Sequence, residues 1–410
     1  MSGGMTDNAA NSAPPAPATR SWSRLDGVDL LRGLAIFGVL LNHVSIRLLL
    51  AKVPFTAGLP HQVTRTLFSN GQTGVQIFFA VSGFLITSTT LRRWGSLRSV
   101  SVREFYRLRF ARIAPLLLTL LAVFTVLHFA NVTIFVVHAK TGGLGRALLA
   151  ALTFHVNVLE ANRGYLPPAW DVLWSLSVEE MFYLFFPVIC RLFGRGKLLV
   201  MILLVFVALG PFARTVLTHG NETWREYSYL GGMDAIALGC LTALLVQRRR
   251  FPRGVLFTLA VCGIAVLTLC LGFSLRVAAW GLTRSGLDMT LIALGTCMVI
   301  IAAAQTKWRS PGILVPILSL GRRSYEVYLT HVFIVLGFFH LFLAAGKPMR
   351  AVPALFVSTV IVAAILGEPV ARFYSEPMNR WLRERWGEGP ERLGSVVDGA
   401  RAMPSEATTA

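Results

Sequence analysis

Long apolar runs alternate with short polar connections along most of the chain. Runs of about 18 to 25 apolar residues recur, which is close to the length that a helix rising about 1.5 Å per residue needs to cross about 30 Å of hydrocarbon. This pattern predicts an all-α, polytopic transmembrane helix bundle. The ten predicted spans are residues 30–50, 73–91, 113–138, 172–193, 197–217, 228–247, 254–273, 287–304, 325–345 and 351–373.

Three segments depart from this pattern. Residues 1–22 are rich in Ala, Pro, Ser and Asn and contain no apolar run, so they predict a disordered tail before a transmembrane domain at 23–386. Residues 387–410 predict a second disordered tail, because they are mostly polar. The apolar segment 145–160 is too short to span, and it predicts an interfacial or re-entrant helix.

The composition and the placement of charge support a membrane protein. Of the 410 residues, 54% are hydrophobic and only 14% are charged, whereas soluble domains carry about 25% charged residues. The net charge is +19, and Lys and Arg gather in alternate connections. If the N-terminus is cytoplasmic, the inner connections hold 18 Lys and Arg in 53 residues and the outer ones 11 in 87. This bias predicts two cytoplasmic termini and explains the positive charge by topology rather than by nucleic-acid binding.

The cysteines give no sign of a cross-linked or metal-bound fold. All five lie inside apolar runs and none has C-x-x-C spacing. The sequence therefore predicts no disulfide framework and no metal site.

The first span carries a pair of ionisable residues, Arg32 and His43. They are eleven positions apart, and eleven helical steps of about 100° end about 20° past three full turns, so both face the same side, roughly 16 Å apart along the axis. Arg32 could simply extend to the interface while His43 packs in the bundle. Alternatively, the imidazole could accept a proton from a hydroxyl group, since its usual pKa lies near neutral pH.

A polar stripe runs along the fourth predicted span. Asp171, Ser175, Glu179 and Tyr183 recur every four residues on a helix that follows two prolines, and Glu180 lies about 100° round from them. Adjacent carboxylates in hydrocarbon need a reason. They could pair with a cation from another span and lock the bundle, or they could take part in chemistry.

A third group is the arginine-rich connection at 92–112, which holds seven arginines. Among them, Arg109 and Arg112 are neighbours on a helix that enters the membrane. Such a cluster could be a topology anchor, or it could hold the phosphates of a nucleotide-like ligand.

Three weaker features complete the polar set. Ser82 and Gly83 form a small-residue site in mid-span, which most simply predicts a close helix contact. Tyr328 and His331 share one face of a span with Ser324, and Asp234 is a further acid within an apolar run.

Taken together, these motifs resemble the acyltransferase 3 family of integral membrane enzymes, whose members O-acylate cell-surface glycans, peptidoglycan, lipo-oligosaccharides and some macrolides. The resemblance extends from about Leu25 to Pro377. It is carried by LDGVDLLRGLAIFGVLLNH, GVQIFFAVSGFLIT, RLRFARIAP, LWSLSVEEMFYLFFP, MDAIALGCL, SYEVYLTH and FYSEPMNRW, in family order.

The resemblance implies roles for the residues that match the family motifs. His43 would be the catalytic histidine with Arg32 as its partner, and Glu179 and Glu180 would be the family's paired acids. We expect Glu179 to orient the imidazole. The remaining matches are an arginine motif for the acyl-CoA donor (Arg107, Arg109, Arg112) and a tyrosine-leucine-x-histidine segment (Tyr328, His331), which we expect on the substrate side with Asp234.

The implied function is an O-acyltransferase in the inner membrane of a bacterium, in contact with membrane lipid. It would move an acyl group, most simply acetyl, from cytoplasmic acyl-CoA to a hydroxyl of a surface carbohydrate or lipid-linked glycan, with no metal. An acyl-histidine intermediate and a homo-oligomer are left open. The alternatives are a proton-coupled transporter, which would also use intramembrane histidine and glutamate, and a scaffold that recruits other enzymes.

Overall fold

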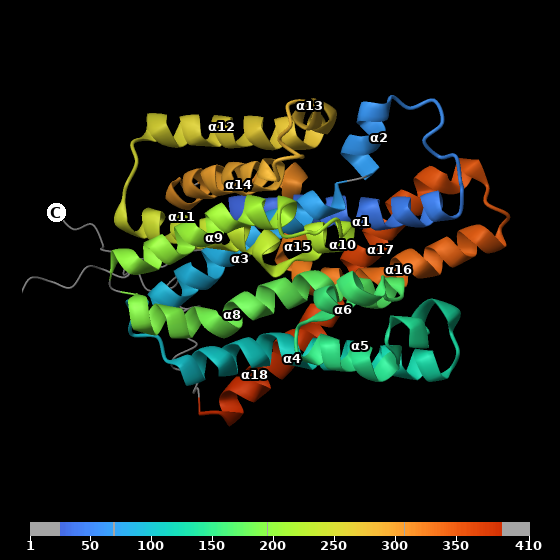
Figure 1. Cartoon of the computed structure of the whole chain (residues 1–410), viewed down its shortest axis with the longest axis horizontal. Helices are drawn as coiled ribbons and strands as arrows, with labels where there is room; N and C mark the ends of the chain where they lie inside the picture. Colours follow the sequence, from blue (N-terminus) through green and yellow to red (C-terminus); the bar gives the residue numbers. More distant parts are fainter. Residues whose placement is uncertain (1–24, 69, 195, 307, 388–410) are drawn as a thin grey trace, which may run out of the picture. The chain divides into compact units, whose positions relative to one another are not determined.

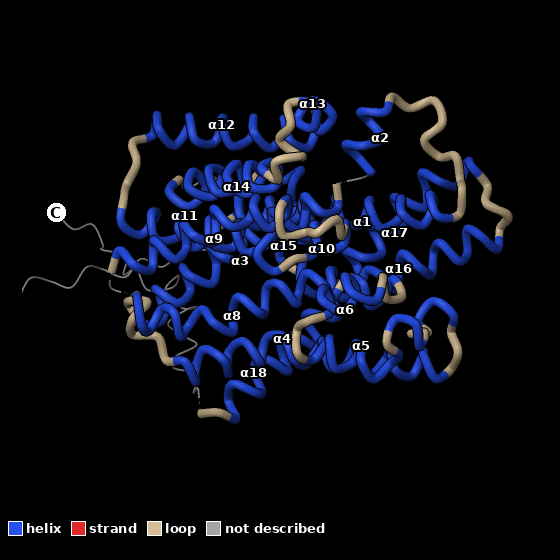
Figure 2. The backbone as a smooth tube through the Cα atoms, in the orientation of Figure 1, coloured by secondary structure: helices blue, strands red, loops and turns tan. Residues whose placement is uncertain are grey.

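The computed structural model describes residues 25–68, 70–194, 196–306 and 308–387, and within these ranges the chain consists of helices and loops without strands (Figure 2). Ten of the described helical segments are long and apolar enough to cross a membrane. The predicted all-α bundle and its number of spans are therefore confirmed. The tails predicted at 1–22 and 387–410 lie outside the described residues, apart from Gly387. The cytoplasmic position of the termini remains a prediction.

The long helices follow one another along the chain with short helices between them (Figure 1). The spanning segments contain α1 (Asp26–Leu50), α3 (Gly71–Trp94), α4 (Val102–Phe129), α7 (Pro168–Asp171) with α8 (Leu173–Phe193), α9 (Lys197–Thr215), α10 (Glu222–Tyr227) with α11 (Tyr229–Arg248), α12 (Arg253–Gly272), α14 (Leu287–Gln305), α16 (Ser324–Ala344) and α17 (Val352–Pro369). The shorter helices are α2 (His61–Phe68), α5 (Gly143–Leu152), α6 (Val156–Arg163), α13 (Ser274–Ala279), α15 (Val315–Arg322) and α18 (Glu376–Arg385). Short 3₁₀ turns occur at Thr133–Phe135, Ala139–Thr141, Gly312–Leu314 and Met349–Ala351, and a π-helical turn at Val370–Ser375 joins α17 to α18.

The third span is placed differently from the prediction of 113–138. Helix α4 begins at Val102, because the Ser101 side chain accepts a hydrogen bond from the Glu104 backbone N–H and caps the helix. It ends at Phe129, just before Asn131 takes a left-handed conformation with a φ of 56°. The arginines after Ser101 are consequently helical, and their side chains have defined directions.

The segment predicted as an interfacial or re-entrant helix at 145–160 is divided between α5 and α6. Phe154 separates the two helices with a φ of 56°, and its carbonyl accepts a hydrogen bond from the Tyr229 hydroxyl at 2.6 Å. The Asn157 side chain donates to the Tyr227 carbonyl at 3.0 Å. Two short helices tied to α10 and α11 in this way do not form a span, so the loops that follow keep the predicted alternation.

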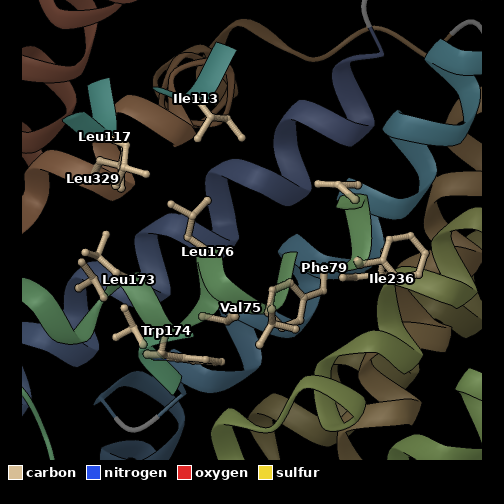
Figure 3. Close-up of a cluster of buried hydrophobic side chains, with 14 of the residues drawn as sticks. Val75, Phe79, Ile113, Leu117, Leu173, Trp174, Leu176, Ile236 and Leu329 are labelled. Atoms are coloured by element: carbon tan, nitrogen blue, oxygen red, sulfur yellow. The ribbon is translucent and has the colours of Figure 1, made fainter. Parts of the chain in front are cut away.

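Close packing of α3 against α11 forms the centre of the bundle. A Cβ atom added to Gly83 would overlap the carbonyl oxygen of Ile236, and one added to Gly239 would overlap that of Ala80. Figure 3 shows Phe79 and Ile236 of these two helices within one apolar cluster. The close contact predicted at Gly83 is therefore confirmed. In Figure 1, α12 lies along one edge of the bundle and α4 along the opposite edge.

We expect Gly83→Ala to destabilise the protein by roughly 1–3 kcal/mol, because the added methyl group forces α3 and α11 apart. Gly38→Ala is the matched control, since Gly38 also lies in a spanning helix but has open space where a Cβ would be. Thermal unfolding of the detergent-solubilised protein compares the two variants. Equal unfolding temperatures for both would contradict the packing described here.

Candidate active site

A cavity of about 460 Å³ lies among α1, α3, α4, α8 and α16. Apolar side chains such as Val75, Phe78 and Leu329 line much of it, so the cavity suits a largely apolar ligand segment. Its charged and hydroxyl-bearing lining residues are Arg32, Ser82, Thr89, Thr90, Arg93, Arg109, Arg112, Ser175, Glu179, Tyr183, Ser324, Tyr325 and Tyr328. Residues from three of the predicted motif groups thus meet around one space.

Arg109 of α4 joins the two adjacent acids of α8. Its Nε donates to both carboxylate oxygens of Glu180, at 3.0 and 3.2 Å, and its Nη2 donates to Glu179 at 3.1 Å. The guanidinium also lies over the ring of Tyr183, 3.9 Å from its centre. The sequence left open whether the paired acids lock the bundle or take part in chemistry. Locking the bundle describes Glu180 well, because its side chain is 7% exposed and pairs with Arg109.

Ser82 completes this network from α3. Its hydroxyl donates to Glu179 and also contacts the Tyr183 hydroxyl, which donates to the same Glu179 oxygen at 3.0 Å. The sequence predicted Ser82 only as part of a helix contact, and it is Gly83 that makes that contact. A serine in an apolar span carries no signal of its partner, so this role depends on the tertiary structure.

Arg32 and His43 both face α16, as their spacing predicted. The Arg32 Nε donates to the Ser324 hydroxyl at 3.0 Å, and Arg32 forms a longer ion pair with Asp29 at 3.9 Å. Arg32 lines the cavity, whereas His43 lies farther along α1 and is not among the lining residues.

His43 lies beside His331, with ring centres 5.0 Å apart and ring planes at 61°. His331 is fully buried, and its Nδ1 lies 2.6 Å from the Tyr328 carbonyl oxygen. A carbonyl can only accept, so Nδ1 carries the proton and Nε2 has the free lone pair. That Nε2 has no hydrogen-bond partner among the described residues. His331 therefore offers a buried acceptor next to His43.

Tyr328 connects the cavity to this histidine pair. Its side chain lines the cavity, and its ring centre is 5.7 Å from that of His331. The Tyr328 hydroxyl is 2.6 Å from the Ser175 hydroxyl and 3.0 Å from the Val172 carbonyl. Tyr328 is thus held between α8 and the histidines.

The structure does not bring Glu179 to His43, contrary to the expectation that this carboxylate would orient the imidazole. Glu179 instead binds Arg109, Ser82 and Tyr183. The physical reason is that a carboxylate inside the bundle gains most from the nearest cation and donors. The imidazole neighbour of His43 is His331.

The three arginines expected to serve the donor have different surroundings. Arg107 lies outside the cavity lining, with its guanidinium 5.8 Å from the centre of the Trp386 ring. Arg109 lines the cavity but is engaged by both acids. Arg112 also lines it, and its side chain keeps 35% exposure while pairing with buried Glu326 at 3.4 Å. Arg93, which received no role from its sequence, lines the cavity as well.

Asp234, expected on the substrate side, is fully buried away from this cavity. Arg214 donates to both of its oxygens, at 2.8 and 3.1 Å, and Gln76 and Thr290 donate to it at 3.0 and 2.7 Å. These bonds use the acceptor capacity of the carboxylate, so Asp234 holds α3, α9, α11 and α14 together.

The part of the chain that the structure describes contains no group of three or more His, Cys, Asp or Glu that could hold a metal ion. The cysteines are free thiols, and four of the five are buried.

A buried acid on α6 faces α7 at the end of the bundle toward which His43 lies. Glu160 is 1% exposed, and one of its carboxylate oxygens accepts a hydrogen bond from the Leu166 backbone N–H at 3.0 Å. Its side chain also interacts with the Asp171 carboxyl group of α7. Burial, reinforced by the neighbouring Asp171, raises the pKa of Glu160 well above its usual value.

Comparison with known proteins adds a family assignment to this geometry. A family model described as an acyltransferase domain matches residues 25–368. The O-acetyltransferase OatA of Staphylococcus aureus (strain NCTC 8325 / PS 47) is 22% identical over 386 residues, covering 91% of this chain and 60% of that protein. The peptidoglycan O-acetyltransferase OatA of Listeria monocytogenes serovar 1/2a (strain ATCC BAA-679 / EGD-e) is 26% identical over 334 residues, covering 76% of this chain and 50% of that protein.

The chain thus spans about 60% or less of the length of these curated relatives. No solved structure matches the chain significantly.

Replacing Arg109 with methionine should lower the stability by about 3–5 kcal/mol, because buried Glu180 and half-buried Glu179 would both lose their cation. Adding Glu179→Gln and Glu180→Gln should recover part of that loss. The control is Arg107→Met, an arginine of the same helix that lies outside the cavity. Chemical or thermal unfolding in detergent measures the effect. A loss no larger than that of the control would contradict the role assigned to Arg109.

The stability should also depend on pH through Glu160. Because its pKa is raised on folding, its stabilising contribution is complete below its unfolded pKa of about 4.3 and is lost as the pH rises through the raised value. The Glu160→Gln side chain stays neutral, so the stability of this variant relative to the wild type should rise as the pH increases. Unfolding temperatures between about pH 5 and 9 test this. A difference between the two proteins that stays constant with pH would disprove it.

Proposed function

Because the chain belongs to the acyltransferase 3 family, we propose that it moves an acyl group, acetyl in the simplest case, from acyl-CoA to a hydroxyl of a surface carbohydrate. The observation that carries the proposal is the His43–His331 pair, which Tyr328 links to an arginine-lined cavity. The chain is a multi-pass membrane protein, and we assign it to the inner membrane of a bacterium. Family membership does not favour the transporter interpretation.

The cavity would receive the acyl-CoA donor. Its apolar walls suit the pantetheine arm, and arginines suit the phosphates. Arg112 is the best-placed phosphate ligand, since its side chain is 35% exposed and its ion pair with Glu326 is 3.4 Å long. Arg109 would act indirectly by holding Glu179 and Glu180, because its Nε and Nη2 already donate to these acids. Arg107 would attract the donor only through its charge.

His43 would act as the general base. A neutral imidazole takes the proton of the acceptor hydroxyl as its oxygen attacks the thioester carbonyl carbon, and such assistance contributes on the order of 10² to 10⁴ in rate. The ester C–O bond forms, the C–S bond breaks, and the proton passes from His43 to the departing thiolate, which leaves as the free thiol of CoA. No further reactant is needed.

His331 would be the positioning residue for that base. An N–H of His43 directed at the free Nε2 of His331 would fix the His43 tautomer and leave the other ring nitrogen facing the acceptor. Arg32, held by Ser324, would stabilise the oxyanion or steady the donor, since it lines the cavity on the same face of α1.

The acceptor assignment draws on the relatives. The Listeria relative is named as a peptidoglycan O-acetyltransferase, so a carbohydrate is the acceptor class that we propose for this chain. With the predicted cytoplasmic termini, the arginine-lined end of the bundle faces the cytoplasmic donor. His43 then lies nearer the outer side, where such an acceptor would arrive.

Membranes that contain the wild type should transfer radiolabelled acetyl from acetyl-CoA to the surface-glycan fraction. His43→Ala should reduce this transfer by about 10² to 10⁴, because the base is lost. His331→Ala should lower kcat by a smaller factor and leave the KM for acetyl-CoA unchanged, since it acts through His43. The control is His340→Ala, an exposed histidine of the same helix α16 as His331.

An active His43→Ala variant would remove the proposed base. Transfer by His331→Ala with an unchanged kcat would restrict His331 to packing. If folded wild type labels no fraction with any acyl-CoA, the acyltransferase proposal itself fails, and uptake into proteoliposomes becomes the next experiment.

A further inference from the structure

A second cavity, of about 260 Å³, lies among α2, α3, α9, α10, α13 and α14. It is near the first residues of α3, whereas Arg93 lines the first cavity near the end of the same helix. The two cavities therefore lie toward opposite ends of α3. With the predicted topology, the second one faces the outer side.

Polar side chains dominate this cavity. Eleven of its 17 lining residues are charged or carry an amide or hydroxyl group. The positive charges of Arg65 and Arg225 equal in number the negative charges of Glu226 and Asp288. The third lining arginine, Arg214, is neutralised by buried Asp234. A balanced, polar lining does not select an acyl chain or an anion.

Hydrogen bonds to Asp234 hold two of the lining residues in place, and we call these two residues the floor of the cavity. These residues are Gln76, which donates to Asp234 at 3.0 Å, and Arg214, whose shorter bond to Asp234 is 2.8 Å. Arg214 also donates to the Gly286 carbonyl at 3.0 Å. The floor is thus formed without a ligand, so binding there would cost little reorganisation.

Several other polar groups that line the cavity have no hydrogen-bond partner among the described residues. Arg65 and the Thr73 hydroxyl make no hydrogen bond or ion pair with a described residue. The Ser274 hydroxyl is shielded from solvent and also lacks a partner within the described ranges. Gln72 uses its amide N–H for the Glu226 carbonyl at 2.9 Å, which leaves its side-chain oxygen available. The cavity therefore presents both donors and acceptors, as a ligand with several hydroxyl groups requires.

Adjacent residues connect this cavity to the histidine pair. Glu226 lines the cavity and lies close enough to Asp171 for their charges to interact. The Tyr227 hydroxyl donates to Asp171 at 3.2 Å, and Asp171 attracts Arg47, one helical turn beyond His43 on α1. Interacting side chains, Glu226, Asp171 and Arg47, thus lead from the smaller cavity to the helical turn next to His43.

We propose that this cavity binds one neutral sugar ring of the acceptor glycan, a ring other than the one that is acylated. The inference rests on the proposed function for the identity of the ligand as an acceptor. Its volume lies below the ~300–1,000 Å³ of pockets for drug-sized ligands, which limits the occupant to a small fragment. The mixture of donors and acceptors specifies a hydroxyl-rich one.

Two variants and a control test the site. Arg65→Gln removes a charge that holds no protein partner, and Thr73→Val removes a hydroxyl while keeping the side-chain shape. The control is Arg284→Gln, an exposed arginine in the adjacent connection that does not line the cavity. Acetyl transfer is measured with soluble peptidoglycan fragments of one to four sugar units as acceptors.

Each cavity variant should raise the KM for the longer fragments by about 5- to 10-fold, which corresponds to one lost hydrogen bond. The kcat, the KM for acetyl-CoA and the KM for the shortest acceptor should not change, because the subsite lies beyond the reacting sugar. The control should match the wild type throughout. An unchanged KM for the longer fragments in both cavity variants would overturn the proposal and leave a water-filled cavity.

A direct binding measurement separates this inference from the proposed function. Saturation-transfer NMR with free N-acetylglucosamine should detect binding to the wild type and a weaker signal with Arg65→Gln. If no acyl transfer is found but this binding is present and sensitive to Arg65, the sugar site stands and the enzymatic proposal fails. If transfer occurs without any such binding, the sugar site is wrong and the enzymatic proposal is unaffected.

Discussion

One guanidinium, that of Arg109, holds together the charged interior of this bundle. Helix α8 carries two adjacent carboxylates into an apolar environment, and Arg109 of α4 binds both of them. Removing charges from water costs several kcal/mol each unless they are paired. The pairing therefore fixes the positions of α4 and α8 relative to each other. It also draws Ser82 of α3 and the ring of Tyr183 into one network that forms a wall of the larger cavity.

This arrangement separates two kinds of polar residue. The acids and Arg109 satisfy one another, so they shape the cavity more than they offer free groups to a ligand. The groups that keep unused capacity are elsewhere: Arg112 at the cavity edge with 35% exposure, and the Nε2 of His331 beside His43. A binding or catalytic site needs such groups, because a fully paired group has no free hydrogen-bonding capacity for a ligand.

The same distinction applies at the other end of α3. Asp234 is a buried acid in a span, which is typical of a functional residue. Its carboxylate nevertheless accepts four side-chain hydrogen bonds from three residues. Its contribution is to fix the base of the smaller cavity, whose unpaired groups lie on α2, α3 and α13. Burial of an acid therefore does not by itself identify a ligand contact. The decisive property is whether its oxygens remain unpaired.

The sequence by itself determined the all-α bundle, its ten spans and the face shared by Arg32 and His43. These follow from local properties, namely apolar run length and the 3.6-residue helical period, which depend only on neighbours along the chain. Only the tertiary structure decided that His331 rather than Glu179 lies beside His43, that Arg107 lies against Trp386, and that Asp234 is enclosed by Arg214. A side chain's partner comes from helices far apart in sequence. Helical periodicity gives the direction in which each residue points, but the packing of one helix against another decides what it meets.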